Sequence, residues 1–323
     1  MLNRLKRVLR WLYPGIGVKR WAGAAVIGAL AATVGILAWA GRDLVSAVYA
    51  YLSPTKQSSA WVAGALILGG MALLIAGISR TVHAIVRGIS PETEGRASEV
   101  LYSRRRLSRG PRIVAVGGGT GLSALLRGLK MLTANTTAVV TVMDDGGSSG
   151  RLRQEMNMLP PGDIRNCLIA LAEDESQIAA LFQHRFHNGS GSLDGHSLGN
   201  LMLAGLQQRT GRFDAAVEAL SQILKVRGSV VPTTLQDVKL VAEMAGGGTV
   251  TGEVAIAQDP RPIRRLRLSE SPVQPYRKVI DALEVADLIV LGPGSLFTSI
   301  VPNLLVEGVP QTIARSRARK VYV

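Results

Sequence analysis

The sequence has little cysteine, few aromatic residues and, over most of its length, little net charge. Its single cysteine, Cys167, excludes a disulfide framework and a cysteine metal site within one chain, and it suits a reducing compartment. Aromatic residues make up 4% of the 323 residues, so we expect no stacking platform for the bases of a nucleic acid. No glycine-rich loop leads into Gly-Lys-Ser/Thr, which excludes a Walker A phosphate loop.

The net charge of +14 is unevenly distributed along the chain. Residues 1–112 carry sixteen Lys and Arg against four Asp and Glu, whereas residues 113–323 carry twenty-one against nineteen. The excess of positive charge therefore lies beside the apolar N-terminal segments. This pattern favours contact with a membrane surface over binding to DNA or RNA.

Two stretches near the N-terminus contain no charged residue, Trp21 to Ala40 and Trp61 to Ser79. Both have the length that spans a hydrocarbon core, so they predict a two-helix transmembrane hairpin. A cleaved signal peptide for the first stretch, or two buried Ala- and Gly-rich helices, are the alternatives. The flanking cations predict that both ends face the cytoplasm, which makes the chain a multi-pass protein of the inner membrane. Glycines such as Gly70 would let the two helices pack closely.

These features divide the chain into four segments. We expect a basic cytoplasmic tail at 1–20, the transmembrane hairpin at 21–80 and a basic juxtamembrane linker at 81–111. Residues 112–323 are predicted to form an α/β domain, Rossmann-like and three-layered, with a mostly parallel sheet.

The centre of this domain is a short apolar run, Ile113 to Val116, that enters a glycine-rich loop and then a helix. Such a loop lets a backbone approach a ligand closely, and the N–H groups of the helix N-terminus favour an anion. A phosphate or diphosphate is the predicted guest, and a sharp turn without a ligand is the alternative. The loop contributes five candidate binding residues: Gly117, Gly118, Gly119, Thr120 and Gly121.

A second strand, Ala138 to Met143, ends in a run of acidic, glycine and hydroxyl residues. Paired carboxylates at the end of a strand can bind a ribose hydroxyl or Mg²⁺, or transfer a proton, and an Asp-Gly turn without function is the alternative. Arginine near such a run favours phosphate. The candidates are Asp144, Asp145, Ser148, Ser149 and Arg151, with Asp144 and Asp145 as ligands for Mg²⁺.

Two further polar clusters precede predicted helices. The first contains Asp163, Arg165 and Asn166, where capping of the helix by Asp163 competes evenly with a role in binding. The second contains His196 and Asn200, which are four residues apart and share a helix face. A lone histidine is more often structural than functional.

A second strand–glycine–helix unit follows near the end of the chain. Ala286 to Leu291 is a predicted buried strand, and its loop supplies Gly292, Pro293, Gly294 and Ser295. In a parallel sheet this loop opens at the same edge as the first. We also expect a helix over 213–225 and strands over 228–231, 238–242 and 249–257.

Five of these motifs, in order, resemble the gluconeogenesis factor family, also called YvcK-like, of the CofD-like superfamily. They read VAVGGGTGLSALLRGLK, TVMDDGGSSGRLR, LPPGDIRNCL, DGHSLGNL and VLGPGSLFTSIVPNLLVEGV, and they span residues 111–323. Family members continue beyond the predicted strand at Lys320 to Val323, so we expect the domain to be C-terminally incomplete.

The resemblance implies a Rossmann-like cytoplasmic domain that binds a UDP-sugar such as UDP-N-acetylglucosamine. It implies a regulatory protein linked to cell shape and peptidoglycan synthesis, acting as a homo-oligomer with a partner in cell-wall synthesis. The alternative is the enzymatic branch of the superfamily, which transfers 2-phospho-lactate to a deazaflavin with Mg²⁺. A nicotinamide-dependent oxidoreductase and a scaffold without a ligand are weaker alternatives.

Overall fold

The computed structural model describes residues 23, 26–34, 58–89, 105–187 and 191–323. The predicted basic tail at 1–20 and residues 90–104 of the predicted linker lie outside the described residues. The chain divides into two compact units, Met1–Tyr102 and Ser103–Val323, which are described separately below.

Two helical segments of the first unit pack closely through glycine. Helix α4 spans Ser58–Ile89, and residues 26–34 are also helical. A Cβ atom at Gly28 would lie 2.7 Å from the carbonyl oxygen of Gly70, and one at Gly70 would lie 2.7 Å from that of Gly28. The absence of a side chain at both positions therefore lets the two backbones meet, as the glycines of the second apolar run predict.

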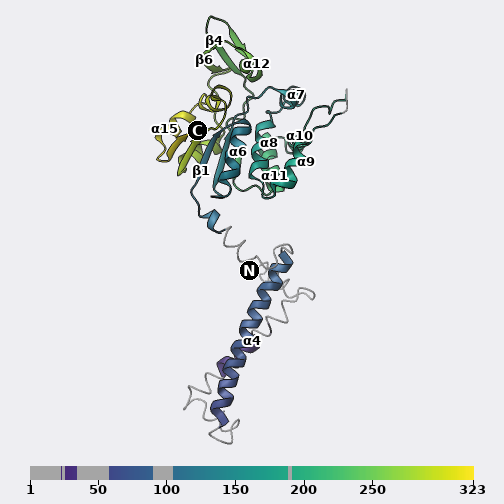
Figure 1. The fold of residues 1–323 in the computed structure, drawn as a ribbon, viewed down its shortest axis with the longest axis vertical. Coiled ribbons are helices and arrows are strands. Elements are labelled where there is room, and N and C mark those ends of the chain that lie inside the picture. The colour runs from purple at the N-terminus through teal and green to yellow at the C-terminus, as the bar shows by residue number, and fades with distance from the viewer. Residues whose placement is uncertain (1–22, 24–25, 35–57, 90–104, 188–190) are drawn as a thin grey trace. The chain divides into compact units, whose positions relative to one another are not determined.

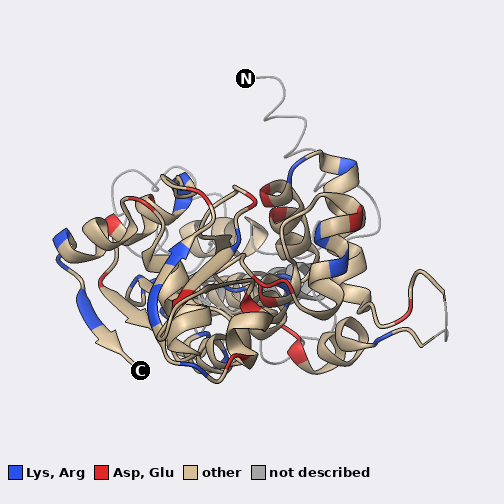
Figure 2. Ribbon diagram, turned by 90° about the horizontal axis from the view of Figure 1, so that it is seen from above, with Lys and Arg blue, Asp and Glu red and all other residues tan. Residues whose placement is uncertain are grey.

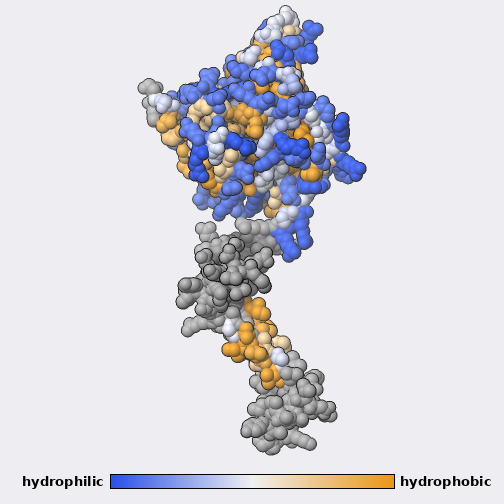
Figure 3. Space-filling view, turned by 180° about the vertical axis from the view of Figure 1, so that it is seen from behind, coloured by the Kyte–Doolittle hydropathy of each residue, from blue (hydrophilic) through white to orange (hydrophobic). Residues whose placement is uncertain are grey.

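The predicted membrane spans are not upheld. Within the described ranges, no helix combines the length and the hydropathy that a bilayer crossing requires. The prediction of a transmembrane hairpin over 21–40 and 61–79, and of an inner-membrane localisation, is therefore corrected. The prediction relied on the absence of charged residues from the two stretches, which a membrane span requires but which does not by itself establish one. Apolar side chains such as Leu30, Leu68 and Ile75 are nevertheless exposed on these helices (Figure 3).

The second unit is built on a five-stranded sheet in which every neighbouring pair of strands is parallel. The strand order is β3-β2-β1-β7-β8, so β1 lies at the centre. This confirms the predicted α/β, Rossmann-like architecture. The strands are β1 Ile113–Gly117, β2 Thr136–Val140, β3 Ser229–Pro232, β7 Leu288–Leu291 and β8 Arg319–Tyr322.

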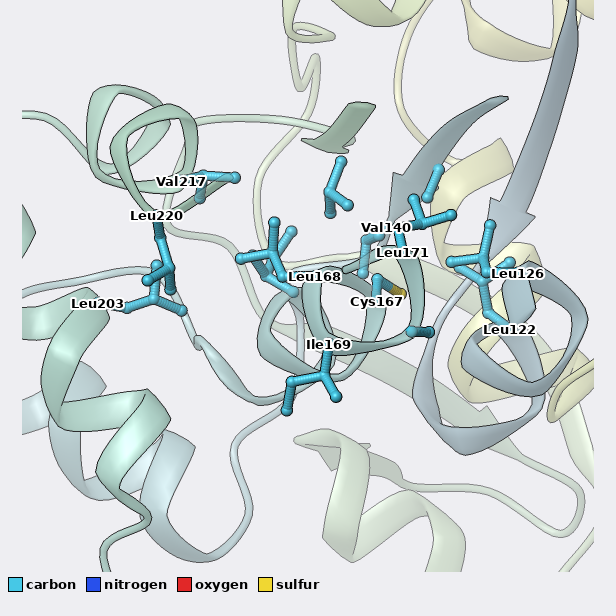
Figure 4. Close-up of a cluster of buried hydrophobic side chains, with 14 of the residues drawn as sticks. Leu122, Leu126, Val140, Cys167, Leu168, Ile169, Leu171, Leu203, Val217 and Leu220 are labelled. Carbon is cyan, nitrogen blue, oxygen red and sulfur yellow. The ribbon is translucent and has the colours of Figure 1, made fainter. Parts of the chain in front are cut away.

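Helices cover both faces of this sheet, because the side chains of β1 alternate between two hydrophobic clusters. Ile113 and Ala115 belong to a cluster with α6, α8 and α11 (Figure 4), and Val114 and Val116 belong to one with α13 and α15. The predicted three layers are thus present. The helices are α6 Gly119–Leu129, α7 Gly147–Met156, α8 Gly162–Leu171, α9 Glu175–Gln183, α10 Leu198–Thr210, α11 Phe213–Ile223, α13 Arg277–Glu284, α14 Val301–Leu304 and α15 Val309–Arg315, with a π-helical turn η2 Leu296–Ile300.

A small antiparallel sheet is inserted between β3 and α13 and projects from the end of the unit (Figure 1). Its strands are β4 Leu240–Met244, β5 Thr249–Thr251 and β6 Ile263–Leu268, in the order β5-β4-β6. Helix α12, Glu253–Gln258, follows β5. The predicted strand over 249–257 is therefore wrong in its second half. Lys and Arg are interspersed with Asp and Glu over this unit (Figure 2), in keeping with the nearly balanced charge of residues 113–323.

Candidate functional site

The predicted glycine loops lie at the same edge of the sheet. Strand β1 pairs in parallel with β2 on one side and with β7 on the other, so the residues that follow each strand meet at their carboxyl ends. The loop after β1, the acidic run after β2 and the loop after β7 are therefore neighbours, as predicted. This edge is where open α/β sheets bind their ligands.

The two glycine loops pack against one another. A Cβ atom at Gly121 would lie 2.7 Å from the carbonyl oxygen of Pro293, and one at Gly294 would lie 3.5 Å from the carbonyl oxygen of Gly118. Gly118 is equally restricted, because its Cβ would lie 2.6 Å from Cγ2 of Thr141. The absence of a side chain at these glycines thus lets segments of the same chain approach one another closely.

Asp163 faces the N-terminus of α6. Its carboxylate accepts a hydrogen bond from the backbone N–H of Gly119, and its Oδ2 lies 2.7 Å from the position of a Cβ on Gly118. The cap position of α8, its own helix, is Pro161, and no side chain caps that helix. Asp163 therefore does not cap α8, which was one of the two roles considered for it. Its carboxylate instead forms a hydrogen bond with the first glycine loop.

The acidic pair at the end of β2 separates into two roles. Asp144 Oδ1 accepts a hydrogen bond from the Gly146 amide at 2.9 Å, whereas Asp145 Oδ1 accepts one from the Val254 amide at 3.0 Å. Asp145 therefore holds the start of α12. Among the described residues, no three or more His, Cys, Asp or Glu side chains are grouped to hold a metal ion. Binding of Mg²⁺ by Asp144 and Asp145 stays a prediction.

A chain of buried hydrogen bonds joins three of the predicted clusters. Arg165 donates to Asn200 Oδ1 at 2.8 Å, and Asn200 Nδ2 donates to Ser148 Oγ at 3.0 Å. Ser148 Oγ lies 2.9 Å from His196 Nδ1. The serine hydroxyl can donate to an unprotonated Nδ1, or its second lone pair can accept from a protonated one, so the direction of this bond depends on the tautomer of His196. Burial and the charge of Arg151 lower the pKa of His196, which favours the neutral imidazole.

The remaining predicted residues surround this network. Arg165 also donates to Asn166 Oδ1 at 2.9 Å, and Ser149 Oγ accepts the Gly162 amide at 3.2 Å. Arg151 donates to the carbonyl oxygen of Asp194, two residues before His196 in the sequence. Thr120 and Ser295 lie at the starts of α6 and η2, in the two glycine loops.

A polar cavity of about 270 Å³ opens where these groups meet. It brings together residues from the acidic run, the Asp163 cluster and Asn200, and it adds Arg185, which sequence reasoning missed. A larger cavity of about 340 Å³ lies beside α11 and β3 and contains none of the predicted residues. The polar cavity is lined by Asp144, Gly146, Gly147, Ser148, Ser149, Gly162, Asp163, Arg165, Asn166, Arg185 and Asn200.

Glu253 is a second residue that sequence reasoning missed. It begins α12, and its carboxylate accepts a hydrogen bond from the hydroxyl of Thr298. Burial, with the charges of Asp144 and Asp163, raises the pKa of Glu253 to about 8. Burial also raises the pKa of Asp163, to about 6. Sequence analysis did not identify Glu253 because apolar and other residues alternate around it, as they do in a strand.

These two groups predict how stability depends on pH. Both bind a proton more tightly in the folded than in the unfolded protein, so their contribution is present at low pH and is lost as pH rises through about 6 and about 8. We expect the urea midpoint of unfolding to fall between pH 5 and pH 8. Glu253→Gln should flatten the upper part of this decline, and an unchanged slope in that variant would contradict the assignment.

The comparisons with known proteins agree with this architecture. Residues 113–323 match the family described as 2-phospho-L-lactate transferase CofD. A protein of Nostoc sp. is 46% identical over 327 residues, which cover 99% of this chain and 72% of that protein. The protein of Bacillus subtilis named gluconeogenesis factor is 51% identical over 213 residues, covering 66% of this chain and 67% of its own.

A solved structure gives the same result. The crystal structure of a Bacillus halodurans protein has a TM-score of 0.64 and 51% sequence identity, covering 66% of this chain and 68% of that one. The sequence motifs, the parallel sheet and the relatives thus point to the same family. The chain belongs to the gluconeogenesis factor family, and its residues 113–323 form a CofD-like domain.

Proposed function

We propose that this chain is a regulatory protein that binds a nucleotide sugar, such as UDP-N-acetylglucosamine, at the carboxyl edge of the parallel sheet. The observation that carries the proposal is the wall of the polar cavity, which combines carboxyl groups with arginines. Carboxylates such as that of Asp144 accept hydrogen bonds from sugar hydroxyls, and guanidinium groups such as that of Arg165 bind phosphate. One cavity thereby offers both kinds of recognition that a sugar phosphate requires.

The names of the relatives support a regulatory role linked to growth on gluconeogenic carbon sources. A link to cell shape and peptidoglycan synthesis, a homo-oligomeric state and a partner in cell-wall synthesis are further parts of the proposal, and they rest on the family resemblance. The second candidate is a CofD-type transferase of 2-phospho-lactate. Residues 113–323 match the family described as 2-phospho-L-lactate transferase CofD, and this match favours the second candidate.

Calorimetric titration of the full chain tests the proposal. We expect UDP-N-acetylglucosamine to bind and to remain chemically unchanged after long incubation. Asp144→Asn should weaken this binding about tenfold or more, because a hydrogen bond to a charged acceptor is worth about 1.5–3 kcal/mol. Asp281→Asn, which removes an exposed carboxylate on α13, is the matched control and should bind like the parent chain.

The same titrations separate the two candidates. Absence of UDP-sugar binding together with Mg²⁺-dependent binding of GDP would overturn the regulatory proposal in favour of the transferase. Conversion of UDP-N-acetylglucosamine during incubation would also overturn the regulatory proposal, because the chain would then be an enzyme that acts on the nucleotide sugar.

A further inference from the structure

The N-terminus of α7 faces the polar cavity without a protein cap. The helix has ten residues and begins at Gly147, after Gly146, and no side chain caps it. Gly147, Ser148 and Ser149, which form its first turn, all line the cavity. The first N–H groups of a helix have no acceptor within the helix and carry a partial positive charge.

The N-termini of α6 and α7 each carry a protein carboxylate, but at different amides: Asp144 accepts the amide of Gly146, which precedes α7, whereas Asp163 accepts that of Gly119, the first residue of α6. The Gly119 amide donates to the carboxylate of Asp163, so an internal anion stands at the first glycine loop. Gly121 is closed off as well, by the backbone of Pro293. The loop with the stronger sequence signal is therefore the less accessible of the two.

A buried arginine gives an independent indication of an anion at this cavity. Arg165 is only 7% exposed and lines the cavity, yet its Nε–H has no hydrogen-bond partner in the part of the chain that the structure describes. Burial and the repulsion from Arg185 lower the pKa of Arg165, whereas the charges of Asp163 and Asp144 raise it. An anion bound beside the two arginines would offset the repulsion between them and accept the unpaired Nε–H.

The carboxyl groups in the same cavity limit the choice of anion. Asp144 and Asp163 each accept a backbone N–H, and each keeps further lone pairs for other donors. A ligand that carries hydroxyl groups next to its phosphate would satisfy both sets of residues. A dicarboxylate without hydroxyl groups has no hydrogen to donate, so it would face the two aspartates without forming hydrogen bonds with them.

We infer that the phosphate or diphosphate group of the ligand binds at the N-terminus of α7, with Arg165 and Arg185 as its counter-charges. The inference rests on the proposed function and makes it more specific, because it moves the anion from the glycine loops to the Gly147–Ser149 turn. The hydroxyl groups of the ligand then face Asp144 and Asp163.

Binding of inorganic pyrophosphate and of UDP-N-acetylglucosamine to the full chain tests this assignment. We expect Arg185→Gln to weaken both by about tenfold or more, since it removes one charged donor. Arg185 is exposed, so its loss should not unfold the protein. Arg264→Gln on β6 removes an equally exposed arginine outside the cavity and is the matched control.

A second pair of variants probes the helix terminus itself. Gly147 has φ +48° and no atom within 4 Å of a Cβ position, so Gly147→Ala places a methyl group in open space at the cavity. We expect about tenfold weaker binding of pyrophosphate. Gly211→Ala, at φ +76° and with equal space, introduces similar backbone strain far along α10 and should bind like the parent chain.

The outcomes distinguish this inference from the proposed function. If UDP-N-acetylglucosamine binds equally well to the parent chain, to Arg185→Gln and to Gly147→Ala, the function stands and the subsite is wrong. If pyrophosphate binds and responds to both variants while no UDP-sugar binds, the subsite stands and the function is wrong. Loss of binding in Gly119→Ala with retention in Gly147→Ala would place the anion at α6 and overturn the inference.

Discussion

Replacing Asn303 by leucine is expected to lower the free energy of unfolding by about 3 kcal/mol, because it leaves several buried polar groups without a partner. Asn303 is fully buried on α14. Its Nδ2 donates to the carbonyl oxygens of Ser299 at 2.7 Å and Gly117 at 3.2 Å, and its Oδ1 accepts the hydroxyl of Thr233. One side chain thus joins the ends of β1 and β3 to the turn that follows β7.

Equilibrium denaturation in urea measures this loss. Asn157→Gly is the control, because Asn157 is exposed at φ +47°, a conformation that glycine adopts readily. We expect the control to change the free energy of unfolding by a few tenths of a kcal/mol. A leucine variant as stable as the parent chain would show that the three bonds contribute nothing net.

Gly121→Ala is expected to cost about 2 to 4 kcal/mol, because its methyl group would overlap the backbone of the second glycine loop. The Cβ would lie 2.7 Å from the carbonyl oxygen and 3.0 Å from the carbonyl carbon of Pro293. Backbone atoms cannot move aside as the end of a flexible side chain can. The two loops must therefore separate, or α6 must shift along β1.

The same helix provides the matched control for this substitution. Gly128 is exposed near the end of α6, and a Cβ there would meet no atom within 4 Å. Gly128→Ala should therefore raise the free energy of unfolding by about 0.5–1 kcal/mol, the usual gain from removing glycine inside a helix. Equal effects at the two positions would show that the contact between the loops is not tight.

The centre of the parallel sheet was predictable from sequence because β1 and β7 are short apolar runs that lead into glycine. The runs at Ile113 and Ala286 met this description, and both strands formed close to the predicted bounds. The inserted sheet was harder to predict. The segment Glu253–Gln258 alternates apolar and other residues, yet it is a helix whose start is held by the bond from the Val254 amide to Asp145, in a distant part of the chain.

The candidate site was predictable in its composition but not in its internal connections. The motifs contain every residue that lines the polar cavity except Arg185, because polar clusters after strands converge at one sheet edge, but the residues of the two glycine loops do not line it. The motifs gave no sign that Asp163 binds the Gly119 amide, since that contact joins two different motifs. Arg185 belongs to no motif, and Asn303 lies in the last motif without having been singled out, so the roles of both follow only from the tertiary structure.

The central position of β1 also has a consequence for synthesis of the chain on the ribosome. One edge of β1 pairs with β2 soon after, but the other edge pairs with β7, and the residues that join there, Arg112 and Asp287, are 175 positions apart. At translation rates of about 5–20 residues per second, this edge of β1 stays unpaired for about 9–35 s before β7 is synthesised. During that interval a strand whose five residues are all buried in the folded domain presents unpaired backbone groups to the cell.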